Sequence, residues 1–132
     1  MSSSLLFVYG TLKLGGKRHH EIAERAELLG AARIQGQLFR IRGQTYPGAF
    51  PGDSGDYIQG ELYRLATPLE TLKRLDEIEG CKEGLFIRRL VDVWQGNRRM
   101  KAWVYFYSRE REKAGRIAGG TFSSPRSLLG KD

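Results

Sequence analysis

The sequence places one carboxylate on the apolar side of a predicted helix, where it could act as an acid or a base. The helix is predicted over "TPLETLKRLDEIEG", from Thr67 to Gly80. At about 100° per residue, its apolar side chains form a single broad arc. The members of that arc are Leu69, Leu72, Leu75 and Ile78. Glu79 falls near the middle of the arc, between Leu72 and Leu75, so we expect its carboxylate to face the protein core.

A glutamate in this position is suited to general acid–base catalysis. Burial and the partial negative charge at a helix C-terminus both disfavour the carboxylate, so both raise the pKa of Glu79. A carboxyl group whose pKa lies nearer neutrality can take up and release a proton. The helix could equally end before Glu79, and its side chain would then turn to water. Asp76 lies at the edge of the arc and could be a buried hydrogen-bond acceptor, whereas Glu77 lies on the polar side and should be solvated.

The second stretch whose residues could take part in binding or catalysis is "YGTL", Tyr9 to Leu12, at the end of an apolar run. Gly10 permits a positive φ, which would let consecutive N–H groups converge into an anion-binding concavity, and Thr11 adds a hydroxyl. Lys13 and Lys17 contribute positive charge nearby. A plain turn between a strand and a loop is the alternative. The stretch lacks the glycine and lysine spacing of a phosphate-binding loop.

Composition bounds the class of protein. The chain has 132 residues, 40% of them apolar, which suits one domain over 1–132 with 1–4 and about 123–132 as flexible ends. A formal charge of +7 favours anionic partners, yet acidic and basic residues are mixed, so we expect no nucleic-acid partner. The single cysteine, Cys81, permits no internal disulfide and is read as a small buried residue. With no apolar run long enough for a membrane span, we expect a cytoplasmic protein without a membrane partner.

Strands and helices that would position these groups follow from the hydrophobic pattern. Strands are predicted at Leu5–Tyr9, Arg33–Ile41, Tyr57–Leu65, Leu85–Trp94 and Lys101–Tyr107. "QGNR" at Gln95–Arg98 indicates a hairpin turn, and Gln44–Asp56 a loop. Helical spacing from Ile22 to Leu29, followed by Gly30, predicts a second helix, and Thr67, Pro68 and Glu70 form a capping-box pattern. The fold class is α+β, a small mixed-sheet β-barrel with two or more short helices.

Taken together, the two stretches resemble the gamma-glutamylcyclotransferase-like family. "VYGTLK" and "LDEIEG", followed by an aromatic-x-Arg sequence, carry the resemblance, with support from "YPGAF", "GELYRL" and "AWVYFY". The branch that the chain resembles contains the gamma-glutamylamine cyclotransferases and their bacterial homologues. The resemblance implies a small mixed barrel in which Tyr9, Gly10, Thr11 and Leu12 hold the glutamyl moiety and Glu79 is the catalytic glutamate.

The resemblance also implies a reaction. The family cyclises γ-glutamyl amines or peptides, releasing 5-oxoproline and a free amine, and uses neither a cofactor nor a metal. Two departures concern the pocket: Phe86 stands where the family usually has a substrate-contacting Tyr, and Phe122 where it often has Trp. The expected partner is therefore a small γ-glutamyl compound whose amine is undefined, and the oligomeric state is left open. A non-catalytic ligand-binding module of the same fold is the alternative.

Overall fold

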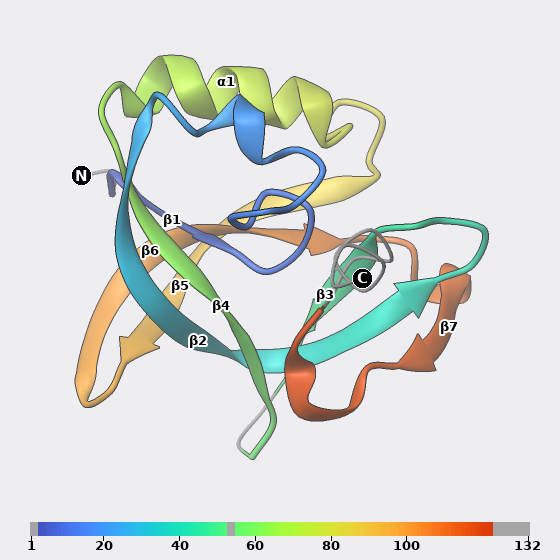
Figure 1. The fold of residues 1–132 in the computed structure, drawn as a ribbon. Helices are drawn as coiled ribbons and strands as arrows, with labels where there is room; N and C mark the ends of the chain where they lie inside the picture. The colour runs from blue at the N-terminus through green and yellow to red at the C-terminus, as the bar shows by residue number, and fades with distance from the viewer. Residues whose placement is uncertain (1–2, 53–54, 123–132) are drawn as a thin grey trace, which may run out of the picture.

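The fold is a mixed five-stranded β-barrel with one α-helix packed on its outside (Figure 1). The computed structural model describes residues 3–52 and 55–122. Within these ranges the chain forms seven strands: β1 Leu5–Val8, β2 Ala26–Ile41, β3 Pro47–Pro51, β4 Tyr57–Leu65, β5 Phe86–Gln95, β6 Arg98–Tyr107 and β7 Lys113–Arg116. The α-helix is α1, Pro68–Ile78, and 3-10 turns lie at His19–Glu21, Glu110–Glu112 and Ala118–Gly120. The α+β barrel predicted from the sequence is confirmed.

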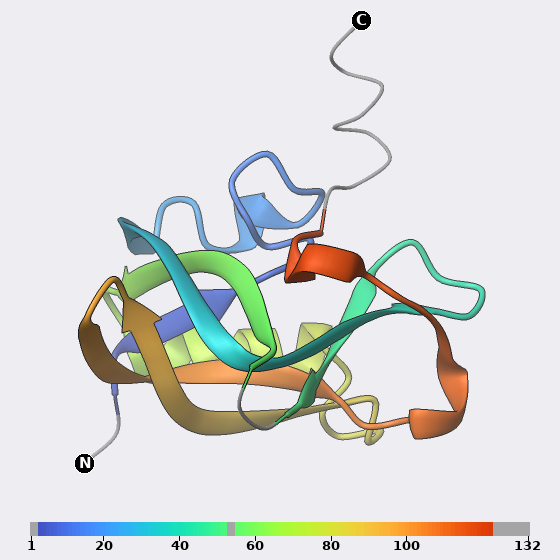
Figure 2. The same ribbon diagram turned by 90° about the horizontal axis from the view of Figure 1, so that it is seen from below.

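Closure of the barrel depends on one long, curved strand. The sheet order is β3-β2-β4-β1-β6-β5, and β2 also pairs with β5 at Arg33 and Trp94, which closes β2, β4, β1, β6 and β5 into a ring. The pair β1–β6 is parallel, and the other pairings are antiparallel. Viewed from below, the strands curl around a filled interior (Figure 2). The far half of β2 pairs with β3 and β7, outside the closed ring.

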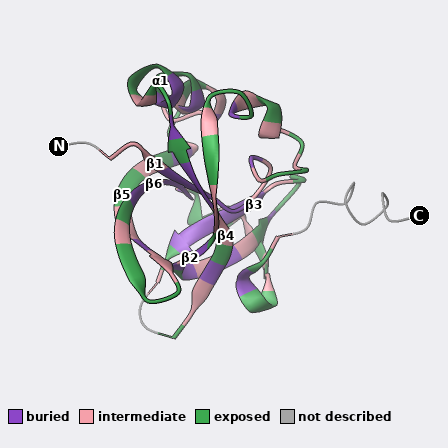
Figure 3. Ribbon diagram, turned by 60° about the vertical axis from the view of Figure 1, so that its left-hand side comes forward, coloured by how far each residue is buried: buried purple, intermediate pink, exposed green. Residues whose placement is uncertain are grey.

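Strand β1 is buried on both faces, as its unbroken apolar run predicts. Phe7 belongs to the core inside the barrel, where it packs with side chains such as Val104 of β6. Tyr9, the residue directly after β1, belongs to the same core. Leu6 and Val8 point outward and pack beneath α1 in a second core. Figure 3 shows buried residues on α1 and on the strands of the barrel. The candidate site lies at the edge of this outer core.

The helix α1 ends in a motif that fixes the direction of the residue after it. Gly80 has φ +68°, its N–H donates to the Glu77 carbonyl at 3.2 Å, and the Cys81 N–H donates to the Asp76 carbonyl at 3.0 Å. This is the Schellman arrangement, in which a left-handed glycine closes the last turn. Glu79, at the C-cap, keeps near-helical dihedrals and a main-chain bond to Leu75. The helical wheel therefore still describes where its side chain points.

Two details of the predicted helix are wrong. Thr67 occupies the N-cap and Pro68 the first helical position, but the Thr67 hydroxyl makes no capping bond and lies 3.4 Å from the Thr71 hydroxyl, so the capping box with Glu70 is not formed. Leu69 is 81% exposed. The buried face is centred on Leu75 and the neighbouring Glu79, and Leu69 falls at its margin.

The second predicted helix is also wrong. Ala26 begins β2 and pairs with Leu65 of β4, and only the short 3-10 turn His19–Glu21 is helical in this region. Gly30, expected to end a helix, has φ +117° and adjoins a bulge in β2. Pairing with β4 has overridden a weak helical pattern. In the predicted loop after β2, residues 47–51 form β3.

The predicted flexibility of residues 123–132, and that of the first two residues, lies outside the described residues. Across the described ranges, no helix has the length and apolar character needed to cross a bilayer.

Candidate active site

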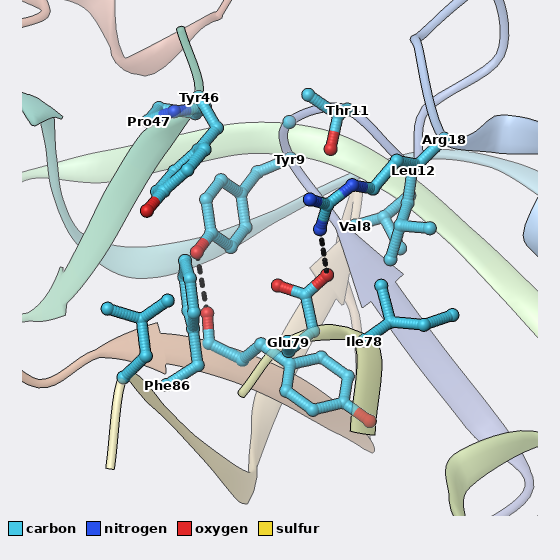
Figure 4. A pocket seen from close by; sticks show the side chains of 13 residues that line it. Val8, Tyr9, Thr11, Leu12, Arg18, Tyr46, Pro47, Ile78, Glu79 and Phe86 are labelled. Carbon is cyan, nitrogen blue, oxygen red and sulfur yellow. Dashed lines mark hydrogen bonds and ion pairs between the residues drawn. The ribbon is translucent and has the colours of Figure 1, made fainter. Parts of the chain in front are cut away.

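The site is a cavity of about 140 Å³ between the C-terminal end of α1 and the outer face of the barrel (Figure 4). The loop after β1 forms one side, and the segment that enters β3 forms another. Its lining residues are Val8, Tyr9, Gly10, Thr11, Leu12, Arg18, Tyr46, Pro47, Ile78, Glu79, Leu85, Phe86 and Tyr105. All six site residues predicted from the sequence therefore meet at one cavity, although they come from two distant parts of the chain, the "YGTL" turn and the segment from Glu79 to Phe86.

Glu79 brings a buried carboxyl group to the cavity. Its side chain points inward, only 8% of the residue is exposed, and Oε2 lies 3.5 Å from Nη1 of Arg18. Burial raises the pKa of Glu79 to about 7, although the charge of Arg18 acts in the opposite direction. A carboxyl group with such a pKa populates both protonation states near neutrality. Glu77, two residues earlier, is exposed, as the wheel predicts.

The "YGTL" turn forms one wall of the same cavity. Thr11 and Leu12 line it, and their N–H groups donate to no acceptor within the described residues. The carbonyl groups of the turn are occupied, because the Gly10 carbonyl accepts from the Lys13 N–H at 3.1 Å and the Thr11 carbonyl from the Arg18 N–H at 2.8 Å. The two free N–H groups make this wall suitable for a carboxylate or an oxyanion.

Gly10 has a different role from the one expected. Its φ is not positive, so the turn does not depend on the left-handed region there. A Cβ at Gly10 would lie 3.1 Å from both Cγ and Cδ of Pro47. The glycine is needed because the turn after β1 passes close to the start of β3, and this approach closes one side of the cavity.

Tyr9 contributes its ring to the cavity, while its hydroxyl is used within the protein. The hydroxyl donates to the Tyr105 carbonyl at 2.6 Å and accepts from the Ala49 N–H at 3.3 Å. Burial raises its pKa well above the ordinary value. Tyr9 therefore ties β1 to β6 and β3 and fixes the position from which the turn starts.

Aromatic side chains form the wall opposite Arg18. Phe86, at the start of β5, is buried and packs against Tyr46 with ring centroids 5.9 Å apart. Tyr107 lies behind both rings, 5.0 Å from Phe86 and 6.4 Å from Tyr46. This wall is apolar toward the cavity floor and carries one hydroxyl, that of Tyr46.

Sequence reasoning missed Arg18 and Tyr46. Positive charge near the turn was expected from Lys13 and Lys17, but Lys13 donates to the Phe122 carbonyl at 2.8 Å and Lys17 is exposed. Arg18 has no local sequence signal, because it lies in irregular structure between β1 and β2 and no pattern of residues around it indicates a site. Tyr46 did have one, since it begins the "YPGAF" stretch.

Cys81 does not provide a nucleophile. It is half-buried, and burial, together with the charges of Asp76 and Glu79, raises its pKa to about 11. The thiol therefore stays protonated near neutral pH. A nucleophilic cysteine must instead be present as the thiolate. Among the described residues, no group of three or more His, Cys, Asp or Glu is arranged to hold a metal ion.

Comparison with known proteins places the chain in a family. Residues 6–124 match the family model described as gamma-glutamyl cyclotransferase, AIG2-like. Gamma-L-glutamyl-butirosin B gamma-glutamyl cyclotransferase from Niallia circulans is 36% identical over 110 residues, which cover 80% of this chain and 67% of that protein. The chain therefore belongs to the AIG2-like gamma-glutamyl cyclotransferase family of enzymes.

Solved structures agree with this assignment. The crystal structure of YkqA from Bacillus subtilis matches with a TM-score of 0.75 and 28% identity, covering 99% of this chain and 44% of that one. This chain thus spans less than half of YkqA. A protein from Pyrococcus horikoshii matches with a TM-score of 0.70 and 29% identity over 98% of both chains.

Proposed function

We propose that this chain cyclises a γ-glutamyl amine, releasing 5-oxoproline and the free amine, with Glu79 as the general acid–base. The observation that carries the proposal is the buried carboxylate of Glu79, which faces a cavity and has a pKa of about 7. The nucleophile and the electrophile belong to the same substrate molecule. The protein therefore has to fold the substrate into a ring-like conformer and move protons, and it needs no nucleophile of its own.

The proton balance of the reaction defines which protons Glu79 would transfer. The α-amine forms a bond to the γ-carbonyl carbon, and the bond from that carbon to the leaving nitrogen breaks. In the process the α-ammonium loses two protons to become the lactam N–H, and the leaving nitrogen gains two to depart as an ammonium ion. Glu79 would accept protons from the first nitrogen and deliver them to the second. The Thr11 and Leu12 N–H groups would hold the α-carboxylate or the developing oxyanion.

The size of the cavity suits the glutamyl moiety alone. At about 140 Å³ it is smaller than the roughly 300–1,000 Å³ of sites that enclose drug-sized ligands. The leaving amine would therefore extend out of the cavity. A wider groove of about 530 Å³ adjoins it and shares Tyr46 and Leu85 with it. Two arginines and two glutamates line this groove (Arg42, Arg109, Glu83 and Glu112), so it offers partners for either charge on the leaving amine.

The test is a substrate panel. Purified protein is incubated with γ-glutamyl amides of simple amines, of the lysine ε-amine and of an aminoglycoside, and with γ-glutamyl dipeptides, and 5-oxoproline release is measured. The relative from Niallia circulans is named for gamma-L-glutamyl-butirosin B, which is why that compound is added to the panel. Release from at least one compound is expected. Binding of 5-oxoproline without any turnover would instead indicate a non-catalytic module.

A further inference from the structure

Arg18 lies on the cavity wall although it comes from irregular structure between β1 and β2. Its N–H donates to the Thr11 carbonyl at 2.8 Å, and Nδ1 of the next residue, His19, lies 2.9 Å from the Leu12 carbonyl. These two contacts hold the loop against the "YGTL" turn. The guanidinium thus reaches Glu79 from a backbone that is fixed, while its side chain remains 39% exposed.

Arg18 is the one cation that lines the cavity within the part of the chain that the structure describes. The other titratable groups near Glu79 are Tyr9, Tyr46, Cys81 and Tyr105. They lie directly after β1, before β3, directly after Gly80 and in β6. Burial raises the pKa of each of these four groups, so all are neutral near pH 7. The charge balance of the cavity is therefore set by Arg18 and Glu79.

The contact between Arg18 and Glu79 uses few of the N–H donors of the guanidinium. Arginine presents five N–H donors in a planar fork that can hold both oxygens of a carboxylate. Arg88 does this with Asp76, at 2.8 and 3.0 Å. Arg18 approaches only one oxygen of Glu79, at 3.5 Å. Its fork is therefore free to take a better-placed carboxylate from a ligand.

We propose that Arg18 binds the α-carboxylate of the substrate, and that Glu79 is thereby left to pair with the substrate's α-ammonium. The head group of an α-amino acid carries a carboxylate and an ammonium group. It can therefore replace the single ion pair between Arg18 and Glu79 with two ion pairs, one to each of these residues. This inference rests on the proposed function. It assigns the Thr11 and Leu12 N–H groups to the γ-carbonyl oxygen, and it makes Arg18 the residue that selects a glutamyl group with a free α-carboxylate.

A matched pair of substrates tests the assignment. The γ-glutamyl amide of an amine is compared with the 4-aminobutyryl amide of the same amine, which lacks the α-carboxylate but can still cyclise, to 2-pyrrolidinone. We expect the wild type to favour the γ-glutamyl amide by roughly 10- to 100-fold in kcat/KM, the range that a charged hydrogen bond supplies. Arg18→Gln should lose most of this preference, mainly through KM, and Arg18→Lys should recover part of it.

Lys17→Gln is the control, because it removes one positive charge from the same loop at an exposed side chain. This variant should keep the wild-type preference. The pH profile gives a second readout: the charge of Arg18 lowers the pKa of Glu79, so Arg18→Gln should move the acid limb of kcat/KM to higher pH. A preference that survives in Arg18→Gln, or is lost equally in Lys17→Gln, would overturn the proposal.

Binding of the two cyclic products separates this inference from the proposed function. Calorimetry compares 5-oxoproline, which keeps the carboxylate, with 2-pyrrolidinone, which lacks it. The wild type should bind 5-oxoproline more tightly than 2-pyrrolidinone. In Arg18→Gln the two compounds should bind with similar affinity. The comparison needs no turnover, so absence of 5-oxoproline release would count against the proposed reaction while the binding result still decides the role of Arg18. Equal binding of both products by the wild type would rule that role out.

Discussion

Asp76 and Glu79 stand three residues apart at the C-terminal end of α1, and only the carboxylate of Asp76 is fully paired. Asp76 accepts two bonds from Arg88, at 2.8 and 3.0 Å, and one from the Tyr105 hydroxyl at 2.7 Å. Among the described residues, the Glu79 carboxylate has one polar partner, Arg18 at 3.5 Å. Asp76 thus joins α1 to β5 and β6, which holds the helix end in place. Glu79, carried on that same end, keeps oxygens that face the cavity.

The first prediction concerns catalysis by Glu79. Glu79→Gln should lower kcat for 5-oxoproline release by roughly 10²- to 10⁴-fold, the usual contribution of a general acid–base group. An amide has nearly the same shape as the carboxyl group but cannot exchange the proton at neutral pH. Steady-state kinetics measures the loss, and circular dichroism checks that the fold is retained.

Glu77→Gln is the matched control for that experiment. Glu77 belongs to the same helix turn and carries the same functional group, but it is exposed. Its substitution should leave kcat and KM within about twofold, as expected for a solvated residue outside the site. If Glu77→Gln were the inactive variant and Glu79→Gln active, the assignment of the acid–base group to Glu79 would be wrong.

The second prediction concerns stability and pH. The pKa of Glu79 is raised from 4.5 to about 7 by burial, so between these values the folded state binds a proton that the unfolded state has released. Stability therefore falls as pH rises through this window, and the loss is complete above pH 7, at up to about 3 kcal/mol. Glu79→Gln abolishes the ionisation. The variant should unfold at higher urea concentration than the wild type at pH 8, with little difference at pH 5.

Urea titrations of both proteins at the two pH values test this sign. The quantity compared is the difference in free energy of unfolding between variant and wild type. A difference of the same size at pH 5 and pH 8 would mean that Glu79 does not titrate in this window.

The third prediction concerns the ion pair that fixes the helix end. The side chains of Arg88 and Asp76 are 24% and 29% exposed, between a buried pair and a surface pair. A double-mutant cycle with Asp76→Asn and Arg88→Gln should therefore give a coupling of about 1–2 kcal/mol. The pair Arg64–Glu27 serves as the control, because its side chains are 55% and 67% exposed. Its coupling should stay below about 1 kcal/mol.

Equal coupling in the two cycles would contradict the structural role given to Asp76. The cycle also has a functional arm, because Asp76 positions the helix end and does not line the cavity. Asp76→Asn should change KM and kcat less than Glu79→Gln does. A loss of kcat as large as that of Glu79→Gln, with stability unchanged, would instead assign Asp76 to the chemistry.

The position of Glu79 was predictable because local rules suffice for it. A single helix with a clear apolar arc and a following glycine determines which way each side chain points, and the Schellman motif extends that geometry by one residue past Ile78. The hairpin at Gln95–Arg98 was predictable for the same reason: Gly96, with φ +57°, supplies the left-handed turn residue.

Arg18 and the start of β2 were not predictable, because they depend on contacts between distant segments. Ala26 belongs to a strand because it pairs with Leu65 of β4. Barrel closure rests on the pairing of Arg33 with Trp94, which no local pattern encodes. The loop that presents Arg18 is held by the Arg18 main-chain N–H, a bond that is independent of side-chain type, and by the His19 ring, whose partner, the Leu12 carbonyl, no local pattern identifies.

The fourth prediction concerns the close approach of Gly10 to Pro47. In Gly10→Ala, the new Cβ would lie 3.1 Å from Cγ and Cδ of Pro47, so either the turn or the start of β3 must move by a few tenths of an ångström. The turn carries the Thr11 and Leu12 N–H groups, and small displacements of such donors are costly. We expect KM for the γ-glutamyl amide to rise roughly 10-fold. Gly115→Ala is the control, since its Cβ would meet only Arg40 Nη1 at 3.7 Å. An unchanged KM and kcat in Gly10→Ala would show that the "YGTL" turn does not bind the substrate.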